Sequence, residues 1–282
     1  MGINPLFQED FFLTIQDKYH AVETISANPF YIVALQQKVY VHLVPLTSNF
    51  TPQQLLSLQV AYQQQGIFLV HLWEDVWATR RNQVLSRIHS FCGLNQSIHG
   101  RKTKVGTLDV SQIRTFLDTN HLQGYIKTKH NYGLFLGDEL VAAACFAAPR
   151  PMKSKGAHYK SAELVRFATK SGFTIVGGLG KLIKAFLEEV PVNDLMTYAD
   201  RDWSLGKGYD KLGFAALRQT KPLFFYVDQK SMQRQQPHRL PKKISSAFAE
   251  QNVLNLDDFM SQQGFVKTFN TGNLKYLLYT NV

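Results

Sequence analysis

A glycine-rich turn between a strand and a helix constrains the fold of this chain more than any other feature. Gly177-Gly-Leu-Gly-Lys181 follows an apolar segment and opens a helix. The apolar residues of that helix are Leu182, Ile183, Phe186 and Leu187. Such a turn gathers free backbone N–H groups and the positive end of the helix dipole, which together can bind a phosphate. It is not a Walker motif, because Gly-x-x-Gly-Lys lacks the required spacing. A tight connection without ligand is the alternative.

The segments around the turn predict a mixed sheet. Tyr132–Leu136 and Leu140–Phe146 flank Gly137-Asp138, a strong hairpin signal, and therefore predict an antiparallel pair. Further strands are expected at 162–169, 195–198 and 214–217, and helices over 109–120 and from residue 204. The predicted fold class is α/β (α+β), with a mixed-sheet domain from about residue 107 onward.

Residues 30–93 predict a separate α/β arrangement. Phe30–Leu35 and Val39–Val44 are β-branched and aromatic runs that predict a strand pair. Thr51-Pro-Gln-Gln54 combines an N-cap Thr, a proline in the first helical position and a capping-box Gln. The apolar run Gly66–Trp73 predicts a buried strand, and Glu74-Asp75 open a long helix that ends at Gly93. Since the chain has 282 residues, two domains are expected.

The segment Tyr209-Asp-Lys-Leu-Gly-Phe214 strengthens the signal of the glycine turn. With the order strand, strand, strand, glycine turn, helix, strand, helix, this half resembles the GNAT superfamily of acyltransferases. The resemblance implies acyl-CoA as cofactor and Tyr209 as the acid that protonates the departing thiolate. It also implies that the pyrophosphate binds Gly177, Gly178, Leu179, Gly180 and Lys181. Where the family has Gln or Arg at the head of the turn, this chain has Thr174-Ile-Val176.

Seven collinear segments are similar to phage-type proteins identified as homing endonucleases, in which a PD-(D/E)XK-like nuclease half precedes a GNAT-like half. They are Gly66–Trp77, Ser86–Ile88, His99–Lys102, Asn120–Gly124, Glu163–Phe167, Ala199–Gly206 and Gly264–Gly272. The resemblance implies a small restriction-endonuclease-like domain over residues 1–106. It implies a GNAT-like domain with a basic C-terminal extension over residues 107–282.

The acids that a PD-(D/E)XK nuclease needs are missing from the strands expected to carry them. Its Asp and its Glu-x-Lys-like pair hold the Mg²⁺ that activates water. Residues 30–35 and 39–44 contain no acid. Glu74 and Asp75 stand at a later strand end, where capping the following helix is the favoured role. We therefore predict a degenerate half without nuclease activity, and no metal site is predicted.

A fainter resemblance links the C-terminal half to Mom-type phage DNA-modification proteins, through Asn120-His121, Glu163–Arg166 and Tyr198–Asp200. It makes His121 and Asp200, beside Tyr209, candidates for acid, base or metal-ligand roles. The alternatives are a surface His at a helix end and an Asp that caps the next turn. Glu163 and Arg166 form either a functional pair or a salt bridge on a sheet face.

Positive charge is the main compositional signal. Thirty-one Lys and Arg against 21 Asp and Glu give a net charge of +10, which favours polyanions through counterion release. The basic residues are clustered, so DNA is the expected partner of a protein of phage or mobile-element origin. The candidate nucleic-acid-binding residues are Arg101, Lys102, Arg150, Lys153, Arg201 and Trp203. Solvated faces, and a core position for Trp203, are the alternatives.

Other classes are excluded by what the sequence lacks. No apolar run approaches the roughly 18 residues that span a bilayer, and no signal peptide is recognisable. Two cysteines, Cys92 and Cys145, are too few for a disulfide framework or a zinc site, so a cytoplasmic protein is expected. Three functions stay open: a GNAT-like transferase or nucleic-acid-modifying enzyme, a non-catalytic DNA-binding protein, and a small-molecule N-acetyltransferase. Acceptor and oligomeric state are not fixed.

Overall fold

The computed structural model describes residues 5–19, 22–36, 39–250 and 255–280 and divides into two compact units. Unit 1 comprises residues 1–81, 200–204 and 220–273, and unit 2 comprises residues 82–199, 205–219 and 274–282. The chain therefore passes between the units five times. The boundary expected at residues 106/107 lies inside unit 2, within strand β6 (Lys104–Thr107).

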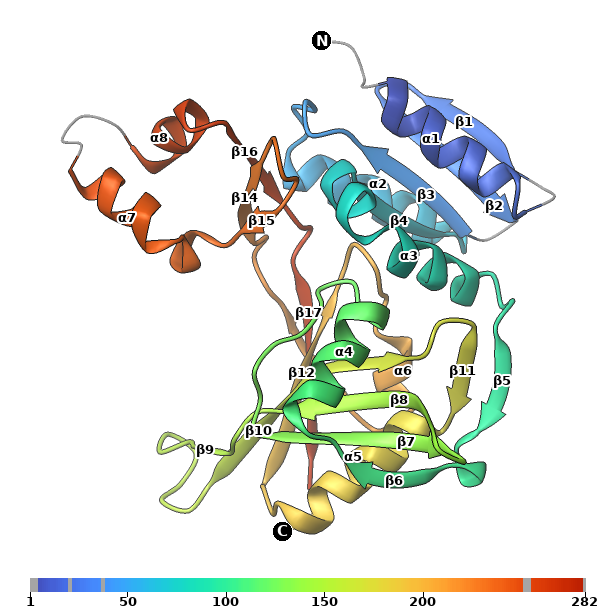
Figure 1. Cartoon of the computed structure of the whole chain (residues 1–282), viewed down its shortest axis with the longest axis vertical. Coiled ribbons are helices and arrows are strands. Elements are labelled where there is room, and N and C mark those ends of the chain that lie inside the picture. Colours follow the sequence, from blue (N-terminus) through green and yellow to red (C-terminus); the bar gives the residue numbers. More distant parts are fainter. Residues whose placement is uncertain (1–4, 20–21, 37–38, 251–254, 281–282) are drawn as a thin grey trace. The chain divides into compact units, whose positions relative to one another are not determined.

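The N-terminal part of unit 1 is a four-stranded sheet with helices (Figure 1). Its strands follow the order β1 (Glu23–Ala27), β2 (Phe30–Gln36), β3 (Val39–Val44) and β4 (Phe68–Trp73). The β1–β2 and β2–β3 pairs are antiparallel, and the β3–β4 pair is parallel. The helices are α1 (Pro5–Gln16), α2 (Pro52–Gln64) and the start of α3 (Glu74–Phe91). The predicted strand pair, helix and buried strand are thus present.

The second part of unit 1 is an insertion between two strands of unit 2. It holds a three-stranded sheet in the order β15 (Arg234–Gln235), β14 (Phe224–Asp228) and β16 (Phe265–Phe269). The short helix η2 (Pro237–Arg239) and helices α7 (Lys242–Ala249) and α8 (Leu256–Gln262) complete it. Val227 and Phe269 of the insertion share one core cluster with Val44, Leu55 and Trp73. Both parts therefore fold as one unit.

Unit 2 is built on a mixed sheet. Its main strand order is β13 (Ala215–Gln219), β17 (Asn273–Tyr279), β12 (Asp194–Asp200), β10 (Lys160–Thr169), β8 (Glu139–Phe146), β7 (His130–Leu136) and β6. The short strand β9 (Arg150–Pro151) also pairs with β10. The β6, β7, β8 and β10 ladders are antiparallel, whereas β10 and β12 are parallel. Along the chain, β7, β8, β10 and β12 follow in the order expected around the glycine turn.

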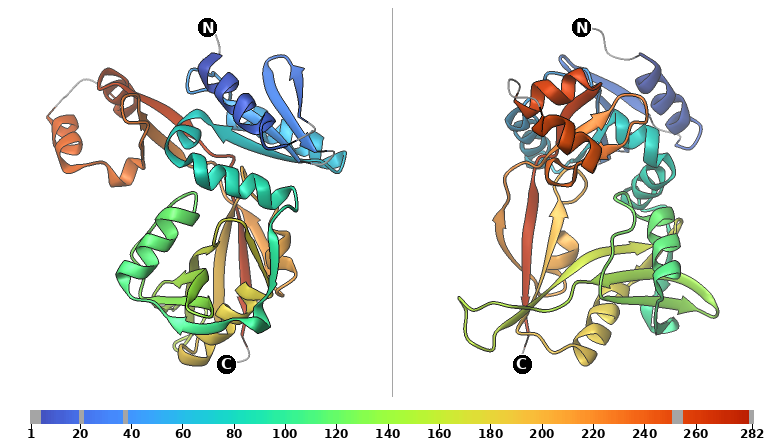
Figure 2. Two further views of the ribbon diagram at one scale, coloured as in Figure 1. Left: turned by 45° about the vertical axis from the view of Figure 1, so that its right-hand side comes forward. Right: turned by 60° about the vertical axis from the view of Figure 1, so that its left-hand side comes forward.

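Two helices cover opposite faces of this sheet. Alternate residues of β8 belong to different core clusters, with Ala142 and Ala144 on the side of α5 (Gly178–Glu189) and Ala143 and Cys145 on the side of α4 (Val110–Asn120). Figure 2 shows α4 in green and α5 in yellow with the strands between them. Such alternation is what a sheet buried on both faces requires.

Smaller elements surround the N-terminal end of α5. Strand β5 (Gln96–His99) pairs in parallel with β11 (Phe173–Val176), and η1 (Gly100–Lys102) follows β5. Helix α6 (Lys207–Asp210) is shorter than the helix expected from residue 204. Helix α3 has non-helical dihedral angles at Arg80 (φ −136°, ψ 29°), beside the boundary between the units at residues 81/82. Among the described residues, no helix is both long and apolar enough to cross a membrane.

Candidate functional site

The glycine turn has the conformation that a phosphate-binding helix start needs. Gly177 is the N-cap of α5 with a φ of 75°, in the left-handed region that favours glycine. A Cβ on Gly178 would lie 2.7 Å from Cγ2 of Ile175, so a larger residue does not fit there. Because Gly177 has no side chain, it offers no capping oxygen to the backbone N–H groups of the first turn. These groups are suited to an external anion.

Lys181 is held by the protein itself. Its ammonium group donates hydrogen bonds to the carbonyl oxygens of Gly100, at 3.1 Å, and of Thr103. These two bonds tie α5 to the η1 segment. That segment is held beside the turn by the pairing of His99 with Val176. Lys181 therefore anchors the turn, and the exposed side chains of Arg101 and Lys102 lie in that same η1 segment.

Strands β10 and β12 of the same unit are paired over only part of their length. Their parallel ladder runs from Ser161 and Asp194 to Leu164 and Thr197, where it stops. Both strands continue, β10 to Thr169 and β12 to Asp200. At the last paired position the hydroxyl of Thr197 donates a hydrogen bond of 3.0 Å to the carbonyl oxygen of Leu164. The backbone groups beyond this point no longer pair across the two strands.

Tyr209 reaches the point where these strands separate. Its hydroxyl is hydrogen-bonded to the side chain of Thr197. Its ring packs against Phe214, at 5.5 Å between ring centroids, and against Tyr276, at 5.3 Å. Burial raises the pKa of Tyr209, whereas the positive charge of Arg87 acts in the opposite direction. Tyr209 therefore keeps its proton at neutral pH.

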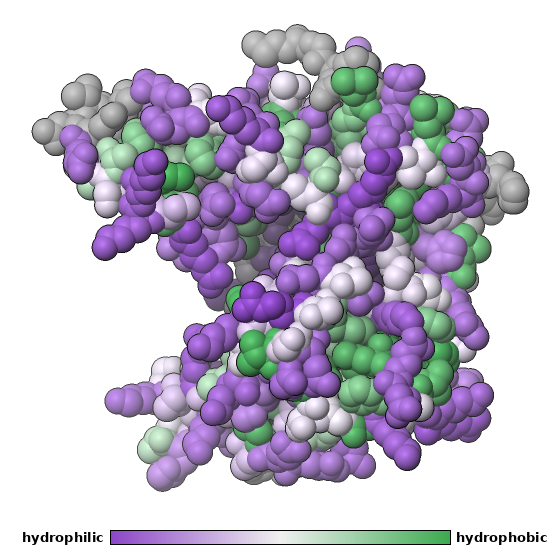
Figure 3. Space-filling model, in the orientation of Figure 1, coloured by the Kyte–Doolittle hydropathy of each residue, from purple (hydrophilic) through white to green (hydrophobic). Residues whose placement is uncertain are grey.

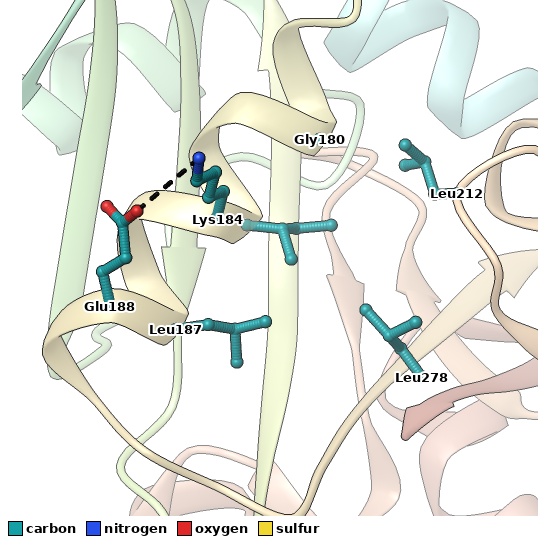
Figure 4. A pocket seen from close by; sticks show the side chains of 7 residues that line it. Gly180, Lys184, Leu187, Glu188, Leu212 and Leu278 are labelled. Carbon is teal, nitrogen blue, oxygen red and sulfur yellow. Dashed lines mark ion pairs between the residues drawn. The ribbon is translucent and has the colours of Figure 1, made fainter. Parts of the chain in front are cut away.

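An open groove of about 360 Å³ adjoins the same helix (Figure 4). It is lined by Gly180, Ile183, Lys184, Leu187, Glu188, Leu212 and Leu278. In Figure 4 the apolar side chains of Leu187, Leu212 and Leu278 lie around the groove, and Lys184 pairs with Glu188 at 3.8 Å. A groove with mostly apolar walls and one Lys–Glu pair, beside the first turns of α5, suits the apolar part of an elongated ligand.

The other predicted catalytic residues, His121 and Asp200, have different surroundings. His121 is the C-cap of α4, and its Nδ1 accepts a hydrogen bond of 3.1 Å from the backbone N–H of Gln123. Asp200 belongs to unit 1, whereas the glycine turn and Tyr209 belong to unit 2. Asp200 and Tyr209 are therefore assigned to different units.

Asp200 is part of a buried charge cluster in unit 1. Asp202 accepts hydrogen bonds from the backbone N–H and the hydroxyl of Thr271, at 2.9 and 2.6 Å. Burial, and the charge of the neighbouring carboxylate in the case of Asp200, raise the pKa of Asp200 to about 7 and that of Asp202 to about 6. Arg234 forms an ion pair with buried Asp75 at 2.5 Å.

The predicted nucleic-acid-binding residues divide into two sets. Arg101, Lys102, Arg150 and Lys153 have exposed side chains in unit 2. Trp203 is only 8% exposed in unit 1, so the core alternative holds and stacking on a base is excluded for the folded unit. Its neighbour Arg201 donates its backbone N–H to the carbonyl oxygen of Gly272 at 3.1 Å.

Two residues of the site were not found from the sequence. Thr197 and Arg87 both act on Tyr209, but neither stands in a motif. Thr197 could have been suspected from its place in the strand before Tyr209. Arg87 is partly buried, and burial lowers its pKa.

Comparisons with solved structures give low-scoring matches to acetyltransferases. An acetyltransferase of Bacillus subtilis in complex with CoA is 14% identical, with 64% of this chain and 99% of that chain covered and a TM-score of 0.35. A GNAT family acetyltransferase of Elizabethkingia anophelis with acetyl-CoA bound is 11% identical, with 64% and 99% covered and a TM-score of 0.37. The ribosomal-protein-S18-alanine N-acetyltransferase of Escherichia coli is 10% identical, with 64% and 95% covered and a TM-score of 0.37.

Similarities of this size identify neither an activity nor a substrate for the chain. No protein-family model matches the sequence, and no curated protein is similar to it. Inferences about function therefore rest on the residues of the site.

Proposed function

We propose that this protein is a GNAT-like group-transfer enzyme that uses an acyl-CoA donor in unit 2. One observation carries the proposal: the Tyr209 hydroxyl meets Thr197 where the ladder between β10 and β12 ends. The glycine turn precedes the helix that packs on the same two strands. A proton donor, a strand gap and a phosphate-binding turn thus occur in the order that the sequence resemblance implies.

The residues around the turn fit the parts of such a donor. Backbone N–H groups of Gly178, Leu179 and Gly180 would bind its phosphates, because a helix start favours negative charge. Lys184 and the apolar groove walls would hold the remainder of the nucleotide end. Lys181 would support the turn from behind through the carbonyl oxygens of Gly100 and Thr103.

The chemistry assigned to the chain is acyl transfer. The donor supplies an activated acyl thioester, whose carbonyl carbon is attacked by a nucleophile of the acceptor. The new bond joins the acyl carbon to the acceptor, and the bond between that carbon and sulfur breaks. Tyr209 gives its proton to the departing sulfur, and the proton lost by the acceptor returns to solvent. Arg87 stabilises the phenolate that remains until it is reprotonated.

Calorimetry with acetyl-CoA tests the donor. We expect saturable binding of acetyl-CoA and weaker binding of a dephosphorylated analogue, because the turn and Lys184 would contact phosphate. The absence of heat at high micromolar acetyl-CoA, with the protein folded by circular dichroism, would contradict the proposal.

We also propose that the acceptor is found on nucleic acid, as the net charge of +10 suggests. A restriction-endonuclease-like ancestry of the N-terminal part belongs to the same proposal. Asp75 is engaged by Arg234, and Glu74 accepts the backbone N–H of Leu46 at 3.0 Å. Both acids therefore have structural roles, which supports binding without cleavage.

A further inference from the structure

We propose that the α4-side face of the unit 2 sheet, along β9, β10, β12, β17 and β13, binds a single strand of nucleic acid. The binding residues are Arg150, Arg166, Tyr198, Arg218 and Lys275, which we call the acceptor face. The inference rests on the proposed function in so far as the bound strand is taken to be the acceptor.

Strand alternation places these side chains on one face. Ala162 and Leu164 of β10 and Leu274 and Tyr276 of β17 pack in the core on the α5 side. Because neighbouring residues of a strand point to opposite faces, Glu163 and Lys275 point to the α4 side. For the same reason Tyr198, between buried Thr197 and Ala199, points there too.

Pairing extends the face across further strands. Arg166 is opposite Cys145, a core residue on the α4 side. Arg150 is opposite Ser161, and Arg218 is opposite Lys275. Directly paired residues lie on the same side of a sheet. From β9 to β13 there are four strand spacings, so the row extends over about 19 Å.

The charges on this face favour an anion. Arg150, Arg166 and Lys275 act on Glu163, whose pKa burial raises while their charges lower it. By the alternation that places Tyr198, Asp200 at the end of β12 points to the same side, and burial raises its pKa to about 7. With Arg218, four cations therefore stand against Glu163 and Asp200, a surplus of at least two positive charges. Asp194, also on β12, adds no net charge because Lys155 pairs with it at 2.7 Å. These acids therefore do not neutralise the row.

Tyr198 distinguishes nucleic acid from other anions. It is 37% exposed, and the ammonium of Lys275 lies 5.8 Å from its ring centroid. Single-stranded nucleic acid is bound by cations that follow the phosphates and by aromatic rings on which bases stack. A salt-bridged sheet face would need no exposed tyrosine among its cations. A duplex would not present its base faces to Tyr198, so a single strand fits better.

Fluorescence anisotropy with a labelled eight-nucleotide DNA strand, in the absence of CoA, tests the proposal on the full chain. Tyr198→Ala should weaken binding about 5- to 150-fold, whereas Tyr198→Phe should bind as the native protein does. Arg218→Ala with Lys275→Ala should reduce the slope of log K against log salt by about 1.4, at about 0.7 for each phosphate contact on a single strand.

A matched pair of lysines serves as control. Lys207→Ala with Lys211→Ala removes the same charge from unit 2, at α6 and its C-cap rather than on the acceptor face, and should leave the slope unchanged. An equal loss in this control, unchanged binding by Tyr198→Ala, or tighter binding of the matching duplex would overturn the proposal. The proposal would also be overturned if polyglutamate displaced the labelled DNA strand as well as unlabelled DNA does.

Parallel calorimetry separates this proposal from the proposed donor. The acceptor-face variants should bind acetyl-CoA as the native protein does. If acetyl-CoA does not bind while Tyr198→Ala still loses the DNA strand, the acyl-CoA proposal fails and the nucleic-acid surface stands.

Discussion

Gly180→Leu should separate stability from donor binding. A Cβ on Gly180 would lie 3.1 Å from Cδ2 of Leu212, so a leucine side chain must extend into the 360 Å³ groove. Replacing a helical glycine by leucine gains about 0.8 kcal/mol in helix propensity. Crowding of Leu212 offsets part of this gain. We therefore expect a free energy of unfolding within about 1 kcal/mol of the native value.

Acetyl-CoA affinity, in contrast to stability, should fall. Filling the groove removes contact area for the donor, and we expect at least a tenfold weaker Kd, or about 1.4 kcal/mol. Titration calorimetry measures the affinity, and urea unfolding measures the stability. Gly208→Leu is the matched control, because a Cβ there meets no atom within 4 Å. Native affinity in a folded Gly180→Leu protein would refute the assignment of the groove to the donor.

Three further outcomes are expected. Tyr209→Phe should slow thiol release from acetyl-CoA by about 10²- to 10⁴-fold while calorimetric affinity stays unchanged; equal rates would remove its role as acid. Asp200 and Asp202 have folded pKa values of about 7 and about 6, above the ordinary 3.8, so their contribution to stability is complete below about pH 4 and is lost as pH rises to about 7. In Asp200→Asn the free energy of unfolding, measured by urea melts, should fall less steeply between about pH 4 and about pH 7. An unchanged pH dependence would contradict the contribution of Asp200. A fragment of residues 107–282 should not melt cooperatively, because it lacks β5 and the buried Ile98; a sharp transition would favour the boundary at 106/107.

Local signals in the sequence predicted local structure well. The Thr51 and Gln54 capping box is present, with Gln54 Oε1 accepting the Thr51 N–H at 2.8 Å. The hairpin at Gly137 joins β7 and β8 as expected. Such features depend on residues a few positions apart, so the sequence contains all the information that they need.

Interactions between distant segments could not be predicted in this way. Periodicity indicates that a segment is a strand but not which strand it pairs with, so the pairing of β5 with β11 was missed. Lys181 looked like a phosphate ligand because the carbonyl oxygens that hold it come from about 80 residues earlier in the chain. The ion pair of Arg234 with Asp75 could not be predicted because the two residues lie 159 positions apart.

The position of β17 has a consequence for synthesis. This strand, residues 273–279, follows both β12 and β13 in the chain but lies between them in the sheet. Proteins generally begin to fold from the N-terminus while the ribosome is still adding residues. Here a nascent chain that has not yet released β17 leaves edges of β12 and β13 unpaired, which invites pairing with other chains. Tyr209 also lacks the ring of Tyr276 until β17 has joined the sheet, so the proposed acid acquires its setting only at that stage.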